Sequence, residues 1–172
     1  MKRLMALAAV LLCACAPVAP ANSVPGAQVE APAGDDWRVT SETAKVIYAR
    51  EDGAASEIVV LQSLATPTFD TDDAFFQYAE NLKATEFAPK PLRGGHFNNT
   101  RFQGAACLSY DRTQDGDDAG ETTRLLGYLC RHPTRAQTAI DMSFTRSAPA
   151  FEMPNDRLDV ANAYLNSVTF TE

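Results

Sequence analysis

Four strand-like segments follow one another in the second half of the chain. In the last of them Ile140, Met142 and Phe144 alternate with polar residues, which is typical of a strand with one buried and one solvent-facing side. The connections are short, and short hairpins join antiparallel neighbours. The segments therefore predict an antiparallel sheet with strands at about residues 97–104, 105–112, 123–132 and 137–146.

Two further strands are predicted nearer the N-terminus. Residues 43–50 and 57–64 are rich in β-branched side chains and flank a turn-like Glu-Asp-Gly cluster at 51–53, so they indicate a β-hairpin. The apolar run 58–61 has no polar alternation. It predicts a strand that is covered on both faces.

Helical spacing of apolar residues appears twice. Phe75, Tyr78, Ala79 and Leu82 recur at the intervals of an amphipathic helix, which predicts a helix from about 71 to 86 that ends before two prolines. Similar spacing follows Asn155, which is a candidate N-cap, and involves Leu158, Ala161, Leu165 and Val168.

The predicted order of elements is ββαββββα, which is an α+β fold. We expect a single antiparallel sheet of about six strands with two helices packed on it, all within one globular domain at residues 37–172. The full chain of 172 residues has room for one domain of ordinary size.

This order is similar to the PsbP-like fold, which is also met in bacterial envelope lipoproteins. The resemblance covers residues 37–172 and is carried by the strand Glu57–Leu64, the helix Phe75–Leu82 and the helix Leu158–Val168. It implies a fold and no particular function. A cystatin-like sheet or a nuclear-transport-factor-like sheet is the alternative, although the latter usually opens with helices.

The N-terminus has the layout of a secretory leader. Lys2 and Arg3 form a basic region, and the apolar run Leu4–Leu12 that follows is too short to span a bilayer. An Ala- and Pro-rich stretch then extends to residue 36, with almost no large apolar side chain. We therefore expect a signal peptide at 1–14 and a linker at 15–36.

The end of the leader, Leu12-Cys13-Ala14-Cys15, resembles the lipobox of bacterial lipoproteins. The resemblance implies diacylglycerol on the Cys15 sulfur, cleavage before Cys15 and acylation of the new amino group. Cys13 is a poorer candidate because the large Leu12 precedes it. Several acyl chains anchor a protein stably to a membrane. The alternative is an ordinary secreted protein.

Residue 16 bears on the destination. In lipoproteins of this kind an Asp directly after the modified cysteine commonly retains the protein at the inner membrane, and here that residue is Ala16. We expect a lipid anchor in the outer membrane with the domain in the periplasm.

The two remaining cysteines, Cys107 and Cys130, fall in consecutive predicted strands. If the hairpin is centred between residues 118 and 119, Cys107 faces Cys130 and Tyr110 faces Gly127. An oxidising envelope compartment favours a disulfide. The alternative is a metal or redox site with His132, but it lacks a fourth ligand and a C-x-x-C motif.

The charge argues against nucleic-acid binding. The net charge is -7, and loss of Lys2 and Arg3 with the leader leaves 13 of the 15 basic side chains against 22 acidic ones. Such a surface repels phosphate backbones. The acidic loop at 115–121 departs from an EF-hand pattern, so it indicates a solvated turn rather than a calcium site.

No motif of a known catalytic class is present, and the chain has only two histidines. The one locally basic segment contains Lys90, Arg93 and His96, a possible contact for an anionic partner. We expect no cofactor and no metal. The leading hypothesis is a non-catalytic envelope domain that binds or scaffolds another component, with proteins as the first expected partners. The alternatives are a hydrolase-like enzyme and a module that binds a small ligand or metal.

Overall fold

The computed structural model describes residues 22–90, 92–116, 120–149 and 153–172. The predicted leader and the predicted lipid site at Cys15 lie outside these residues and stay predictions. The tip of the acidic loop at 117–119 also lies outside the described residues. Within the described ranges, neither helix has both the length and the apolar character needed to cross a membrane.

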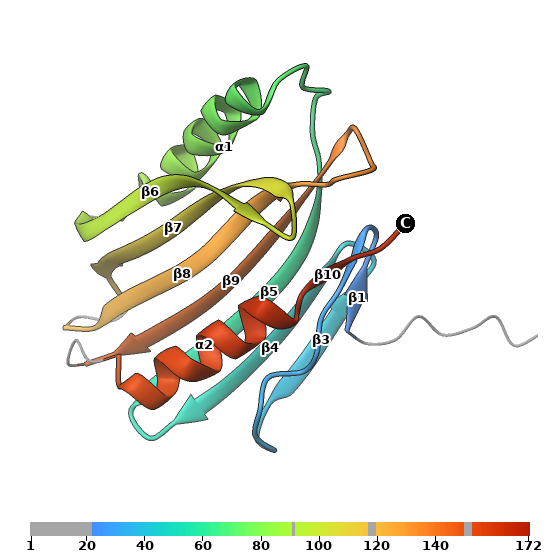
Figure 1. Cartoon of the computed structure of the whole chain (residues 1–172). Coiled ribbons are helices and arrows are strands. Elements are labelled where there is room, and N and C mark those ends of the chain that lie inside the picture. Colours follow the sequence, from blue (N-terminus) through green and yellow to red (C-terminus); the bar gives the residue numbers. More distant parts are fainter. Residues whose placement is uncertain (1–21, 91, 117–119, 150–152) are drawn as a thin grey trace, which may run out of the picture.

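A seven-stranded antiparallel sheet forms the body of the protein (Figure 1). Its spatial order is β3-β4-β5-β9-β8-β7-β6, so each predicted hairpin is present and β9 joins the first hairpin to the rest. The strands are β3 (Arg38–Glu42), β4 (Lys45–Asp52), β5 (Ala55–Ala65), β6 (Leu92–Phe102), β7 (Ala105–Asp115), β8 (Thr122–Arg131) and β9 (Thr138–Ala148).

A second, three-stranded sheet joins the two ends of the domain. It consists of β1 (Ser23–Val24), β2 (Ala27–Gln28) and β10 (Thr169–Phe170), with β2 in the middle. The prediction of a single sheet of about six strands is therefore wrong, although the fold is still α+β. Each strand of the small sheet has two residues, too few for any periodic pattern to show.

The small sheet also changes the predicted linker boundary. Val24, Ala27 and Val29 were expected in the linker at 15–36, yet all three are buried in the core. Their burial depends on pairing with residues near the C-terminus, which a composition rich in Ala and Pro does not reveal. The folded part of the chain therefore includes residues 22–29.

Two helices cover opposite faces of the large sheet. Helix α1 (Asp72–Phe87) has Thr71 as its N-cap, and the Thr71 Oγ1 accepts a hydrogen bond from the Ala74 amide at 3.2 Å. This helix confirms the one predicted at about 71–86. Helix α2 (Asn155–Ser167) follows Pro154 as N-cap, without a side-chain cap. The prediction that Asn155 caps this helix is wrong, because Asn155 is already its first residue.

The alternation of side chains along the strands divides the core in two. On one face Phe75 and Ala79 of α1 pack against Leu108 and Leu129 of the sheet. On the other face α2 packs against β9 and β8 and contributes residues such as Leu165 to a larger core. We call these the α1 face and the α2 face.

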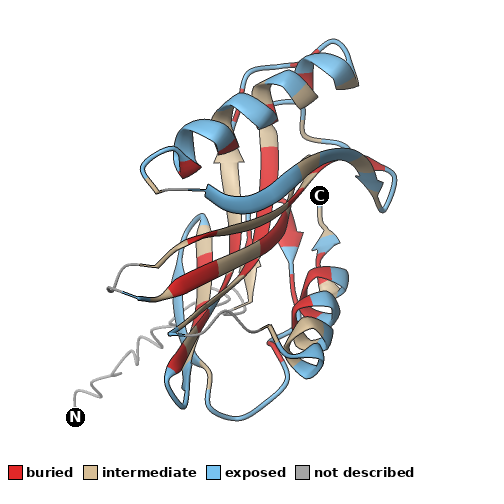
Figure 2. Cartoon of the chain, turned by 90° about the vertical axis from the view of Figure 1, so that its left-hand side faces the viewer, coloured by how far each residue is buried: buried red, intermediate tan, exposed pale blue. Residues whose placement is uncertain are grey.

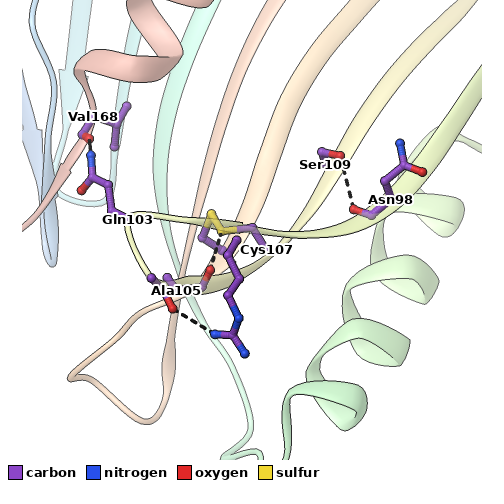
Figure 3. Close-up of a disulfide and its surroundings, with 9 residues drawn as sticks. Asn98, Gln103, Ala105, Cys107, Ser109 and Val168 are labelled. Atoms are coloured by element: carbon purple, nitrogen blue, oxygen red, sulfur yellow. Dashed lines mark hydrogen bonds between the residues drawn. A yellow bond between two sulfur atoms is a disulfide. The ribbon is translucent and has the colours of Figure 1, made fainter.

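The predicted register of the β7–β8 hairpin is confirmed. Cys107 faces Cys130 and the two form a disulfide (Figure 3). Tyr110 faces Gly127. A Cβ atom at position 127 would overlap the Tyr110 hydroxyl, so this position needs a glycine. The ring of Tyr110 therefore lies directly over the backbone of β8.

Candidate functional site

The α2 face is only partly covered by its helix. Helix α2 packs over the middle of the sheet, and β6, β7 and part of β8 extend beyond it. The space between the helix and these strands is a cavity of about 350 Å³, which we call the α2 groove. Its lining includes His96, Ser109, Asp111, Arg124, Leu126, Tyr128, Leu158, Asn162 and Leu165.

One end of the groove carries a paired charge. Arg124 donates from Nε to Asp111 Oδ1 at 3.0 Å and from Nη2 to Asp111 Oδ2 at 2.7 Å, and both side chains are about a quarter exposed. The hydrogen bonds to Asp111 raise the pKa of Arg124 above its ordinary value. The pair gives the groove a fixed, oriented dipole without net charge.

His96 lies at the same end. It faces Asp111 directly in the β6–β7 ladder, so its side chain is on the α2 face. It is exposed, and it also lines a second cavity of about 280 Å³ with Leu92 and Phe97. His96 therefore stands where the two cavities meet.

Apolar side chains form one wall of the groove. Leu126 and Tyr128 come from β8, and Leu158 and Leu165 come from α2. The Tyr128 ring stacks on Phe102 with 5.6 Å between the ring centroids, which holds the ring in place. A bound molecule would thus meet a polar end and an apolar wall.

The β6–β7 turn is tied to the end of helix α2. Gln103 Nε2 donates to the backbone carbonyl of Val168 at 2.6 Å (Figure 3). Gln103 has a positive φ of 49° and is followed by Gly104 at 82°, so the two residues form a tight hairpin turn. This contact fixes the spacing of the helix and the hairpin that form the two sides of the groove.

The groove contains Ser, His and Asp side chains, but their contacts do not make a catalytic relay. Ser109 Oγ donates to the Asn98 carbonyl at 3.2 Å (Figure 3). Both oxygens of Asp111 accept from Arg124. The hydroxyl and the carboxylate are thus engaged with groups other than His96, whereas a relay needs the base hydrogen-bonded to both.

The other histidine, His132, has a structural position. Its Nδ1 accepts from the backbone amides of Thr134 at 3.2 Å and Arg135 at 3.0 Å. The proton is therefore on Nε2, which donates to the carbonyls of Gly26 at 2.9 Å and Thr171 at 3.1 Å. His132 thus joins the β8–β9 loop to the β1–β2 turn and to the residue that follows β10 in the small sheet. The metal alternative also loses its ligands, because Cys107 and Cys130 are bonded to each other.

The predicted basic segment is only partly brought to the groove. His96 lines it, whereas the Arg93 guanidinium pairs with Asp115 at the far end of the β6–β7 hairpin. The Lys90 carbonyl accepts from Arg112 in the turn after α1. Within the described ranges, no group of three or more His, Cys, Asp or Glu side chains could hold a metal ion.

Most groove residues were not predicted as a site. Asp111 and Arg124 are diagonal neighbours in the predicted β7–β8 register, so their pairing could have been inferred from the sequence. The position of Asn162 could not, because it depends on how α2 crosses strands that lie far away in the chain.

The comparisons with known proteins give a fold. No protein-family model matches this chain, and no curated protein sequence matches it. Among solved structures it is similar to LpqN of Mycobacterium tuberculosis, which is described as involved in cell envelope biogenesis. The TM-score is 0.57 with 17% sequence identity, over 86% of each chain. At this identity the similarity shows a shared fold, and the lipobox and the PsbP-like resemblance stay predictions.

Proposed function

We propose that this chain is a non-catalytic lipoprotein of the bacterial envelope, whose domain binds another envelope component in the α2 groove. The observation that carries the proposal is the groove itself, which combines a charge-paired polar end with an apolar wall. The leader that resembles a lipobox supports the location, with the outer membrane and a periplasmic domain as its finer form. The fold shared with LpqN, a protein involved in envelope biogenesis, supports it too.

Binding fits the contacts of the groove better than hydrolysis. The hydroxyl of Ser109 and the carboxylate of Asp111 already have partners, so a hydrolase would have to break both contacts before His96 could activate a nucleophile. A binding site makes no such demand. Its polar groups need only be fixed in position, and the Asp111–Arg124 pair is fixed by two hydrogen bonds.

We propose a segment of a partner protein as the occupant. The polar end has no net charge and the wall is apolar, so the groove fits an amphipathic segment without a strong charge. A small ligand is the second candidate, because the volume of about 350 Å³ lies in the usual range of ligand pockets.

Crosslinking in cells tests the proposal. The full-length chain would be compared with Asn162→Trp, which fills the groove, and with Asn81→Trp, which places the same side chain on the exposed surface of α1. A Cys15→Ser variant removes the predicted anchor. We expect one specific partner with the wild type and Asn81→Trp, and its loss with Asn162→Trp and Cys15→Ser.

Two results would change the conclusion. Equal recovery of the partner by Asn162→Trp would exclude the groove as its site. A small molecule seen by native mass spectrometry on the purified wild-type chain, and missing from Asn162→Trp, would establish the second candidate instead.

A further inference from the structure

Strand β6 forms an open edge of the large sheet. It runs for eleven residues, and among the described residues no strand pairs with its outer side. Figure 2 looks onto this edge and shows β6 as a long exposed strand crossing the front of the molecule below α1. An edge of this kind presents a row of unpaired backbone N–H and C=O groups.

The disulfide identifies which backbone groups point outward. The Cα atoms of Cys107 and Cys130 are 4.0 Å apart, the close spacing of a pair without mutual backbone hydrogen bonds. The backbone groups of Cys107 therefore point the other way, toward its β6 neighbour Thr100. Because the direction alternates along a strand, Thr100 points inward to β7. The outward-pointing residues are then Gly95, Phe97, Asn99 and Arg101.

The two edges of the sheet differ in their protection. Strand β3 is short, at five residues, and has Arg38 and Glu42 at its ends, which are common ways to discourage pairing. Strand β6 has a bulge between Leu92 and Gly94 and an arginine at 101, but residues 95–100 contain no Lys, Arg, Asp, Glu or Pro. The middle of this edge is therefore open to another strand.

We infer that this edge binds a second copy of the same chain. Two β6 strands can pair antiparallel about a twofold axis at Asn98, so that Asn99 faces Phe97 of the second copy and Arg101 faces its Gly95. Every outward-pointing residue then meets another outward-pointing residue, and the four pairs form about eight backbone hydrogen bonds. The result is one continuous sheet across both copies.

The side chains are compatible with this register. Strand β6 contains no acidic residue, and its arginine at 101 faces a glycine, so like charges do not meet across the axis. At the axis, Asn98 of one copy faces Asn98 of the second copy. The side-chain amide can both donate and accept a hydrogen bond. His96 would face Thr100 of the second copy on the α2 face, which places the two α2 grooves on one continuous surface.

Sedimentation of the full-length chain in detergent tests the second copy. Proline at an outward-pointing edge position removes a donor that the fold does not use, so Asn99→Pro should fold but not pair. Ser41→Pro is the matched control on the outer side of β3. We expect the mass of two chains for the wild type and Ser41→Pro, and of one chain for Asn99→Pro. Circular dichroism would verify that all three are folded.

Cysteine crosslinking tests the register separately. Asn98→Cys would place two thiols opposite each other at the axis, in the same kind of pair as Cys107–Cys130, whereas Thr100→Cys and Ser41→Cys would not. Under mild oxidation we expect several-fold more covalent dimer from Asn98→Cys than from either control. A wild-type chain that sediments with the mass of one copy would overturn the inference. That result would stand even if Asn99→Pro failed to bind some other protein. Equal crosslinking of the three variants would also overturn it.

Discussion

The two faces of the large sheet use polar residues in opposite ways. On the α1 face, Lys83 Nζ lies 2.5 Å from Asp141 Oδ2, and Tyr110 donates to the other oxygen of Asp141 at 2.8 Å. Helix α1 covers this group, and the Lys83 side chain is only 2% exposed. On the α2 face, the Asp111–Arg124 pair stands in an open groove. Polar groups that are enclosed stabilise the fold, whereas those left in contact with solvent are available to a ligand.

The α2 face also contains an enclosed polar group, which sharpens the contrast. Glu57 is fully buried near the start of α2, and it accepts from Arg50 Nε at 2.8 Å and from Arg146 Nη1 at 2.6 Å. The same helix thus covers one ionic cluster and leaves another open. The division between structural residues and the binding residues that we propose follows coverage by the helices rather than residue type.

The largest effect is expected at Glu57. Glu57→Ala leaves Arg50 and Arg146, each only 11% exposed, without their shared partner. Removing one side of a buried ion pair costs about 3–5 kcal/mol, so the free energy of unfolding should fall by that amount in urea denaturation. Glu42→Ala on the exposed strand β3 is the control, and it should change little. A loss below about 1 kcal/mol at Glu57 would mean that burial does not make this carboxylate structural.

The second-largest loss of stability is expected when the disulfide is removed. It closes a sequence separation of 23 residues within the core of the α2 face. A loop of that length contributes about 3.5 kcal/mol in the chain-entropy model. The double variant Cys107→Ala, Cys130→Ala should lose that much stability and still fold. An equal stability of the double variant and the oxidised wild type would contradict this estimate.

Two buried tyrosines, one on each face, allow the contribution of a buried hydroxyl to stability to be compared between the faces. Tyr110 on the α1 face donates to the Asp141 carboxylate, whereas the buried Tyr164 hydroxyl on the α2 face has no hydrogen-bond partner among the described residues. Tyr110→Phe should cost about 1.5–3 kcal/mol, because a hydrogen bond to a charged group is lost. Tyr164→Phe should leave stability unchanged or slightly higher at neutral pH. The same loss for both would remove the distinction between the two hydroxyls.

Alkaline pH should reduce the stability that the enclosed polar group on the α1 face contributes to the fold. Burial, with Asp141 as a neighbour, raises the pKa of Tyr110 well above its ordinary value. Burial opposes charge on Lys83, but Asp141 and Glu86 outweigh it and raise the pKa of Lys83. Both groups bind protons more tightly in the folded state, so their stabilisation is complete below pH 10 and is lost as the pH rises.

The size of this effect can be measured as a slope. Above about pH 10, each group that stays protonated only in the folded state lowers the unfolding free energy by about 1.4 kcal/mol per pH unit. Tyr164 and Tyr48, whose pKa values are also raised by burial, contribute to the wild-type slope. Lys83→Met with Tyr110→Phe should therefore make the slope shallower without removing it. An unchanged slope would contradict the role of the α1 face.

The sequence predicts the parts of this fold that have local patterns. The β7–β8 register follows from one loop centre, and it correctly places Cys107 against Cys130 and Tyr110 against Gly127. Helix α1 follows from its spacing and the prolines after it. Strand β3 was missed because all five of its residues are exposed, so it carries no apolar alternation.

The candidate site depends on how elements far apart in the sequence pack together, which no local sequence pattern predicts. The α2 groove exists because α2 packs against β9 and β8 and stops short of β6, and this follows from the summed packing of the core. The small sheet also depends on contacts between distant parts of the chain, since His132 links residues 26 and 171 from the two ends of the domain. Of the predicted binding residues, only His96 reaches the groove, because its place opposite Asp111 is set by the β6–β7 hairpin.

The smallest effect on stability is expected in the groove. Arg124→Ala removes a pair whose side chains are 25% and 27% exposed, and solvated pairs of this kind contribute at most about 1 kcal/mol. The same substitution leaves Asp111 as an unpaired negative charge at the polar end, so binding in the groove should weaken far more than the fold. Arg124→Lys, which keeps the charge but cannot form both hydrogen bonds, should have an intermediate effect on binding. Denaturation and crosslinking of the same variants measure the two effects side by side. A loss of stability as large as that of Glu57→Ala would place this pair with the enclosed clusters and leave the groove without a polar end available for binding.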